Sequence, residues 1–152
     1  MEIKIIAVGK LKSYFQEALN DYAKRIKTFC NLKIIEVKEA NTDDIEKNIR
    51  DEANAIKNHI NNNDYLITLE IEGHLLDSIA FATKIQDHYL YSDRCIAFVI
   101  GGSNGIGNDL RERANEKFSF GRFTYPHQLM RVILVEQIYR ALMINNNSKY
   151  HK

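Results

Sequence analysis

The sequence of 152 residues has only two cysteines, one proline and no apolar run of the roughly 18 residues that a membrane-spanning helix needs. Cys30 and Cys95 are far apart and form no C-x-x-C pair, so we expect free thiols in a reducing compartment. Charged residues interrupt the apolar stretch from Met1 to Lys12. We therefore expect neither a membrane span nor a signal peptide, and a cytoplasmic location.

A metal site is not indicated either. The five histidines include no pair at a ligand spacing such as H-x-x-x-H, so we expect no metal. The length of the chain suits one domain, since most domains have roughly 100–150 residues. We expect residues 1–152 to form a single domain.

The net charge of +1 gives no direct reason to expect a nucleic-acid binder. The charge is unevenly distributed, however. Residues 61–100 hold two basic and six acidic groups, whereas residues 101–152 hold eight basic and four acidic ones. A local basic face can contact phosphates even when the total charge is near zero, and the last third of the chain is a weak indication of such a face.

Short β-rich runs alternate with helical patterns along the whole chain. The periodicity predicts strands at residues 3–8, 32–37, 65–71, 95–100 and 118–120, and helices at about 11–26, 42–60, 78–90, 109–115 and 128–144. Asn41 or Thr42 is expected to cap the second helix. The run from Cys95 to Ile100 is almost purely apolar, as in a strand that is covered on both faces. This pattern predicts an α/β fold with a mostly parallel sheet and helices on both faces.

A glycine-rich segment, residues 101–107, follows the most apolar strand. Open α/β sheets bind ligands beyond the carboxyl ends of their strands, and glycines let a ligand approach the backbone. The spacing does not fit G-x-G-x-x-G, and Asn108 stands where a P-loop needs lysine. A phosphate cradle and a nucleotide-dependent oxidoreductase are therefore not expected. Two interpretations of residues 101–107 remain: a flexible turn that leads into a helix, and a loop that binds a ligand.

Two further segments allow a structural and a functional interpretation. Residues 119–128 contain three aromatic side chains and the only proline, Pro126, which could simply direct the chain into the last helix. The aromatic side chains could instead grip an aromatic ligand. The tail, Lys149–Lys152, is either a frayed end or a group that stacks on a base and contacts its phosphate.

The last predicted helix, residues 128–144, has a broad apolar surface. Such a helix in a short chain is either central to the core or part of a subunit interface. We expect a homodimer, with Ile138 in the interface. Glu136 and Arg140 are four residues apart and can form an ion pair along the helix.

Several of these segments together carry a family resemblance: Val99–Gly105, Ser119 with Thr124–Gln128, Arg131 with Glu136–Ala141, Tyr150–Lys152, and also Leu69–Gly73 and the first strand. They resemble the RlmH family of bacterial methyltransferases in the SPOUT (α/β-knot) superfamily, over the whole chain. The resemblance implies a carboxyl-terminal trefoil knot and a homodimer. It also implies methyl transfer from S-adenosyl-L-methionine to N3 of a pseudouridine in 23S ribosomal RNA, on the assembled ribosome.

The resemblance also assigns roles to individual residues. It places the cofactor at Leu69, Gly101, Phe120, Gly121, Arg122, Phe123, Thr124 and Tyr125. It places catalysis at His151, Tyr150 and Arg131, and RNA binding at His127, Arg140 and Lys152. Either His151 or His127 could accept the imide proton of the target base, because histidine titrates near neutral pH. A ribosome-binding protein that kept the fold and lost catalysis is the main alternative, which the intact loop and tail motifs disfavour.

Overall fold

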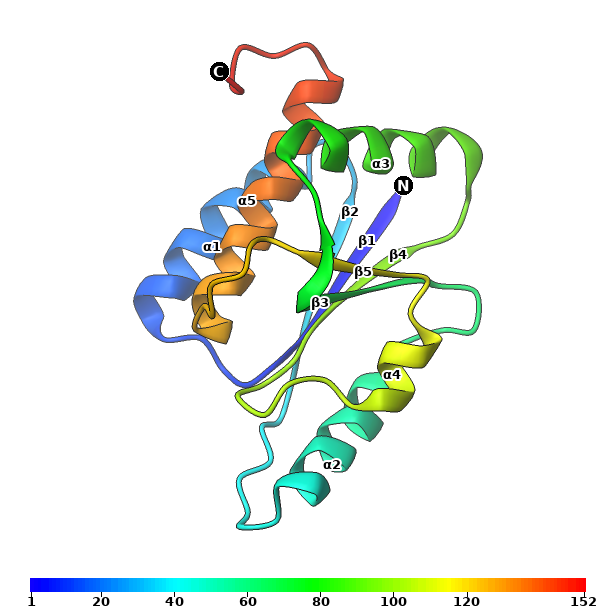
Figure 1. The fold of residues 1–152 in the computed structure, drawn as a ribbon. Helices are drawn as coiled ribbons and strands as arrows, with labels where there is room; N and C mark the ends of the chain where they lie inside the picture. The colour runs from blue at the N-terminus through cyan, green and yellow to red at the C-terminus, as the bar shows by residue number, and fades with distance from the viewer.

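A five-stranded parallel sheet forms the centre of the computed structural model, which describes all 152 residues (Figure 1). The strand order is β2-β1-β4-β3-β5, and every neighbouring pair is parallel. In chain order the elements are β1 (Glu2–Val8), α1 (Ser13–Ile26), β2 (Asn31–Val37), α2 (Ile45–Lys57), β3 (Tyr65–Leu75), α3 (Ser78–Tyr91), β4 (Ile96–Ile100), α4 (Asn108–Arg113), β5 (Glu116–Ser119) and α5 (His127–Asn145).

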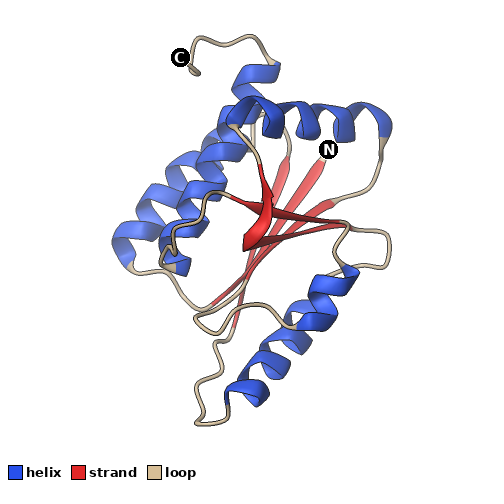
Figure 2. Ribbon diagram, in the orientation of Figure 1, coloured by secondary structure: helices blue, strands red, loops and turns tan.

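Helices cover both faces of this sheet, as Figure 2 shows. On one face, α1, α3 and α5 pack around a core that includes Phe81 and Leu134. On the other face, α2 and α4 contribute Ile56 and Leu110 to a second, smaller core. All five residues of β4 are buried, because this central strand is covered from both sides. The predicted α/β fold with helices on both faces is confirmed.

The helix α5 packs against both α1 and α3. Ile138 on this helix is completely buried in the core of its own chain, so the expectation that it lies in a subunit interface is wrong. The apolar side chains of α5 that keep partial exposure include Leu129, Val132 and Ile133. The sequence could not separate these two sets, because the helix is apolar around most of its circumference.

The start of α2 differs from the prediction. Asp44 is the N-cap, and its carboxylate accepts a hydrogen bond from the backbone N–H of Lys47 at 3.0 Å. Thr42, one of the two predicted caps, donates its hydroxyl to Asn48 Oδ1 at 2.6 Å instead. The helix is therefore capped by Asp44, and neither Asn41 nor Thr42 caps it.

The strand β3 is longer than predicted and continues to Leu75. Its pairing with β5 shifts register between Leu69 and His74. Within this irregular stretch the two backbones come very close, since a Cβ on Gly73 would lie 2.6 Å from the carbonyl carbon of Phe118. The bulged half of β3 is part of the wall of the site described below.

The trefoil knot that the resemblance implies concerns the path of the chain after β5, and it stays a prediction. None of the helices combines the length and the apolar character needed to cross a bilayer.

Candidate functional site

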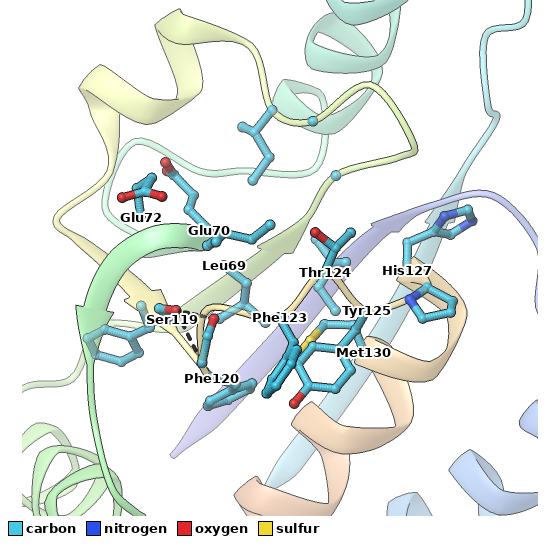
Figure 3. Close-up of a pocket in the computed structure, with 18 of the residues that line it drawn as sticks. Leu69, Glu70, Glu72, Ser119, Phe120, Phe123, Thr124, Tyr125, His127 and Met130 are labelled. Atoms are coloured by element: carbon cyan, nitrogen blue, oxygen red, sulfur yellow. Dashed lines mark hydrogen bonds between the residues drawn. The ribbon is translucent and has the colours of Figure 1, made fainter.

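A cavity of about 690 Å³ lies at the carboxyl edge of the sheet (Figure 3). Its walls come from the bulged half of β3, from the glycine-rich loop after β4, and from the loop between β5 and α5. These segments are distant in the sequence, and the strand order β4-β3-β5 brings them together. This is the region of an open α/β sheet in which ligands bind.

Most of the residues that the resemblance assigns to the cofactor line this cavity: Leu69, Gly101, Phe120, Gly121, Phe123, Thr124 and Tyr125. Arg122 does not line it. Its guanidinium donates a hydrogen bond to the carbonyl of Ile71 and lies 3.9 Å from the carboxylate of Glu72. The loop therefore turns this charged side chain away from the cavity that its neighbours enclose.

The cavity has walls of different character. Figure 3 shows the aromatic rings of Phe120, Phe123 and Tyr125 on one side, which we call the aromatic wall. The carboxylates of Glu70 and Glu72 lie on another side of the same view. Arg111 lines the cavity as well and lies 2.7 Å from Glu70, so the arrangement offers flat apolar surface to one part of a ligand and charged groups of both signs to another.

The glycine-rich loop folds back on itself after β4. The N–H of Gly105 donates to the carbonyl of Gly102 at 3.1 Å, and Gly105 has a φ of +87°, which favours glycine. A Cβ on Gly101 would lie 2.8 Å from the carbonyl oxygen of Gly105. Glycine at position 101 is thus required by the backbone of the loop itself, before any ligand is considered.

The loop between β5 and α5 is fixed at its start by Ser119, which is buried. The hydroxyl of Ser119 donates to the carbonyl of Gly121 at 2.9 Å and accepts from the N–H of Gly121 at 3.2 Å. The Phe120 ring packs edge-on against Phe81 in the core, with ring centroids 6.1 Å apart. The Phe123 ring, in contrast, is 79% exposed, so its face is free to contact a ligand.

Glu70 lines the cavity, although no motif in the sequence assigns a role to it. Its carboxylate accepts hydrogen bonds from Thr68 Oγ1 at 2.6 Å and from Arg111 Nε at 2.7 Å. Arg111 lies on α4, so this ion pair ties the helix after the glycine-rich loop to β3. An ion pair between two separate elements leaves no spacing signal in a single sequence.

His127 is the first residue of α5 and borders the cavity. Its Nε2 atom lies 3.5 Å from the position that a Cβ on Gly9 would take. The next residue, Gln128, accepts a hydrogen bond from the backbone N–H of Lys12 at 2.8 Å. The loop after β1 therefore holds the first turn of α5 beside the cavity.

Arg131, which the resemblance assigns to catalysis, is fully buried behind this first turn. Its guanidinium donates to the carboxylate of Glu36 at 2.6 Å and to the carbonyls of Val8 and Gly9 at 3.1 and 3.0 Å. Pairing of this kind is what stabilises a buried charge. Arg131 thus joins α5 to the ends of β1 and β2 and does not line the cavity.

The tail lies against the opposite half of α5 (Figure 1). Tyr150 donates its hydroxyl to Glu136 at 3.1 Å, and His151 Nδ1 lies 3.3 Å from a guanidinium nitrogen of Arg140. Along α5, Glu136 and His127 are separated by about 14 Å at 1.5 Å per residue. The fold therefore brings Tyr150, His151 and Arg140 together, but not beside the cavity of their own chain, and Lys152 is exposed at the end.

The protonation of Tyr150 limits its chemistry. Burial, together with the neighbouring Tyr22 hydroxyl and the Glu136 carboxylate, raises the pKa of Tyr150. The phenol is therefore neutral near pH 7. It acts as a hydrogen-bond donor and an aromatic surface, and it is not a base.

The segment Gly101–Gly105 also has the G-x-S-x-G spacing of hydrolases, in which a serine nucleophile sits on a sharp turn between a strand and a helix. In this structure residues 101–107 separate β4 from α4. The hydroxyl of Ser103 donates to the carboxylate of Glu39 at 3.3 Å and has no hydrogen bond to a histidine. The serine therefore lacks the geometry of an activated nucleophile.

Comparisons with known proteins agree on one family. A family model with the description "Predicted SPOUT methyltransferase" matches residues 1–151. The protein named ribosomal RNA large subunit methyltransferase H of Oenococcus oeni is 46% identical, over 100% of this chain and 99% of its own. The protein of the same name from Ligilactobacillus salivarius is 45% identical, over 100% of both chains.

A solved structure also resembles the whole chain. It is a probable methylase family protein from Haemophilus influenzae, with a TM-score of 0.59 and 15% identity, over 99% of this chain and 70% of that one. At this identity the likeness concerns the fold alone.

Proposed function

This chain belongs to the SPOUT methyltransferase family, and we propose that it methylates N3 of a pseudouridine in 23S ribosomal RNA, on the assembled ribosome, with S-adenosylmethionine as methyl donor. The names of the relatives from Oenococcus oeni and Ligilactobacillus salivarius support a substrate in the large ribosomal subunit. The observation that carries the proposal is the cavity, which gathers residues from three distant segments to which the resemblance assigns cofactor binding. A ribosomal substrate implies a cytoplasmic location.

The walls of the cavity fit S-adenosylmethionine. The volume of about 690 Å³ falls within the roughly 300–1,000 Å³ that is usual for small-molecule sites. The aromatic wall and Leu69 suit the purine ring, and the backbone of the glycine-rich loop can hydrogen-bond its edge. The ion pair of Glu70 and Arg111 places polar groups of both signs on the wall of the cavity, which suits the zwitterionic amino-acid end of the molecule. When bound, S-adenosylmethionine supplies an electrophilic methyl group.

The protein must orient the target nitrogen and accept its imide proton. Alignment of the reacting groups supplies much of the acceleration in such a transfer, and a base in reach of the proton contributes a further 10²- to 10⁴-fold or so. His127 borders the cavity, and His151 lies on the tail, so these two side chains are the proposed proton acceptors. Tyr150 would stack on the extruded base, and Lys152 would contact its phosphate.

The proposal includes a homodimer, because the tail docks far from the cavity of its own chain. The partly buried residues Leu129, Val132 and Ile133 of α5 offer an apolar surface for a second copy. A tail docked beside that surface could then reach the cavity of the partner. Each active site would be built from both protomers.

Mass spectrometry of 23S rRNA from cells with and without this protein tests the activity. We expect loss of one methyl group from a pseudouridine in cells that lack the protein, and its return when purified protein and S-adenosylmethionine are added to their ribosomes. A protein that binds ribosomes but shows no heat of binding to S-adenosylmethionine would contradict the proposal.

A further inference from the structure

The carboxylate of Glu136 is the centre of a hydrogen-bond network between α5 and the tail. It accepts from Arg140 at 2.6 Å and from the Tyr150 hydroxyl at 3.1 Å, and its other oxygen accepts from Gln137 at 2.7 Å. The side chains of Glu136 and Arg140 are only 17% and 25% exposed. Partly buried ion pairs are screened less by salt and water than exposed ones, so this contact is stronger than an ordinary pair on a helix surface.

Arg140 contacts both functional side chains of the tail. Its guanidinium carbon lies 4.8 Å from the centre of the Tyr150 ring, a distance suited to a cation–π interaction. Another nitrogen of the same group lies 3.3 Å from His151 Nδ1. Because its Nε and Nη2 atoms both donate to Glu136, the guanidinium of Arg140 is held in place beside the tail.

The reversal of the chain after α5 is also built into the structure. Asn147 has a φ of 54°, the left-handed conformation that ends many helices. The N–H of Asn147 donates to the carbonyl of Ile144 at 3.0 Å, and the N–H of Ser148 donates to the carbonyl of Met143 at 2.9 Å. These two bonds form a Schellman motif, which turns the tail back along the helix.

The surface that receives the tail is made by two helices. The Tyr150 ring packs edge-on against Tyr139 of α5, with centroids 4.9 Å apart. Tyr139 in turn packs against Tyr22 of α1 at 6.1 Å, and Arg25 lies 5.7 Å from the centres of both of these rings. A frayed end would have no such set of matched contacts.

We propose that Glu136 and Arg140 form a clamp that holds Tyr150 and His151 in the orientation needed for methyl transfer. The inference rests on the proposed function, because methyl transfer is the step that the tail would serve. Glu136 is a positioning residue in this scheme, since it acts through Tyr150 and Arg140 and does not line the cavity. A clamped tail enters the reaction already ordered, which lowers the entropic cost of aligning the base.

The replacement Glu136→Gln tests the clamp, because glutamine keeps the shape of the side chain and removes its charge. We expect unchanged binding of S-adenosylmethionine and an unchanged KM for ribosomes. We expect kcat to fall roughly 10- to 100-fold, the effect of a misplacement of about 1 Å. Digestion with carboxypeptidase gives an independent readout, since the released tail of the variant should be removed faster than that of the wild type.

Two further variants make the result specific. Asp51→Asn breaks the exposed Lys47–Asp51 pair, which has the same spacing on α2 and an N–O distance of 2.8 Å. This control should change neither kcat nor the digestion of the tail. Glu136→Asp keeps the charge and should recover part of the kcat that Glu136→Gln loses.

Equal kcat and equal digestion rates in Glu136→Gln and the wild type would overturn the clamp. A parallel loss of Tm and of S-adenosylmethionine binding would also overturn it, because Glu136 would then support the fold in general. Digestion does not depend on activity. If the wild-type protein leaves rRNA unmethylated, the proposed function is wrong. The rates of carboxypeptidase digestion of Glu136→Gln and the wild type would still show whether Glu136 holds the tail.

Discussion

Gly101 and Gly105 approach each other so closely across the loop after β4 that a Cβ on Gly101 would lie 2.8 Å from the carbonyl oxygen of Gly105. Any larger residue at position 101 must therefore open this loop. Because the loop forms one wall of the cavity, its shape and the binding of the cofactor depend on the same contact.

Gly101→Val should weaken binding of S-adenosylmethionine at least tenfold, about 1.4 kcal/mol, because the loop backbone must move. Isothermal titration calorimetry measures the affinity, and circular dichroism checks that the chain stays folded. Asn104→Ala changes an exposed residue of the same loop and serves as the control. Normal affinity in Gly101→Val would place the cofactor elsewhere.

Removal of the four carboxyl-terminal residues tests the tail as a whole. A chain that ends at Ser148 keeps the Schellman motif and lacks Tyr150, His151 and Lys152. We expect it to fold, to dimerise and to bind S-adenosylmethionine, but not to methylate ribosomes, and His151→Ala alone should reproduce most of the loss of rate. If the shortened chain methylates ribosomes at the normal rate, the tail has no role in methyl transfer.

The subunit interface can be separated from the core by two matched variants on α5. Val132→Asp places a charge on a partly exposed position and should yield folded monomers without activity. Ile138→Asp places a charge at a fully buried position and should prevent folding, since an unpaired buried charge costs several kcal/mol. Light scattering gives the mass and circular dichroism the fold. A native protein that is a monodisperse monomer would exclude the proposed dimer.

Because of Glu52, we expect the stability of the folded chain to depend on pH. Burial raises the pKa of Glu52 above its ordinary value of 4.5, despite a hydrogen bond from the N–H of Ala40 at 3.1 Å, and the second carboxylate oxygen has no partner. The folded chain favours the neutral carboxyl, so this stabilisation is complete below pH 4.5 and is lost as the pH rises through the raised pKa.

The isosteric variant Glu52→Gln stays neutral throughout this range. Its free energy of unfolding relative to the wild type should therefore increase as the pH rises above 4.5. Urea denaturation at a series of pH values measures the difference. Stability curves that run parallel for the two proteins would contradict the assignment.

Replacement of Arg131 tests whether this residue has a structural or a catalytic role. Replacement by methionine removes the bonds to the exposed carboxylate of Glu36 and to the carbonyls of Val8 and Gly9. It should lower the stability by roughly 1–3 kcal/mol, the cost of leaving buried polar groups without a partner. Chemical denaturation measures this loss. If kcat collapses while the stability is unchanged, the residue acts directly in catalysis.

Local patterns in the sequence were sufficient for the order of the elements and for the segments that form the site. The spacing of apolar residues in α1 and the apolar run of β4 are set by which side of each element faces the core, and this information is local. Where the chain departs from regular geometry, the prediction failed. The bulge that extends β3 depends on its pairing with β5 and on the close approach of Gly73 to Phe118, which involve residues far apart in the sequence.

The α/β class, the family and the segments that line the cavity follow from motifs and periodicity, which are properties of neighbouring residues. The meeting of distant side chains depends instead on the folded chain: Glu70 with Arg111, Arg131 with Glu36, and Glu136 with Tyr150. The burial of Ile138 in the core of its own chain depends on the folded chain as well. These pairings follow from the strand order and from the packing of α5 between α1 and α3, which are properties of the whole chain and of no single segment.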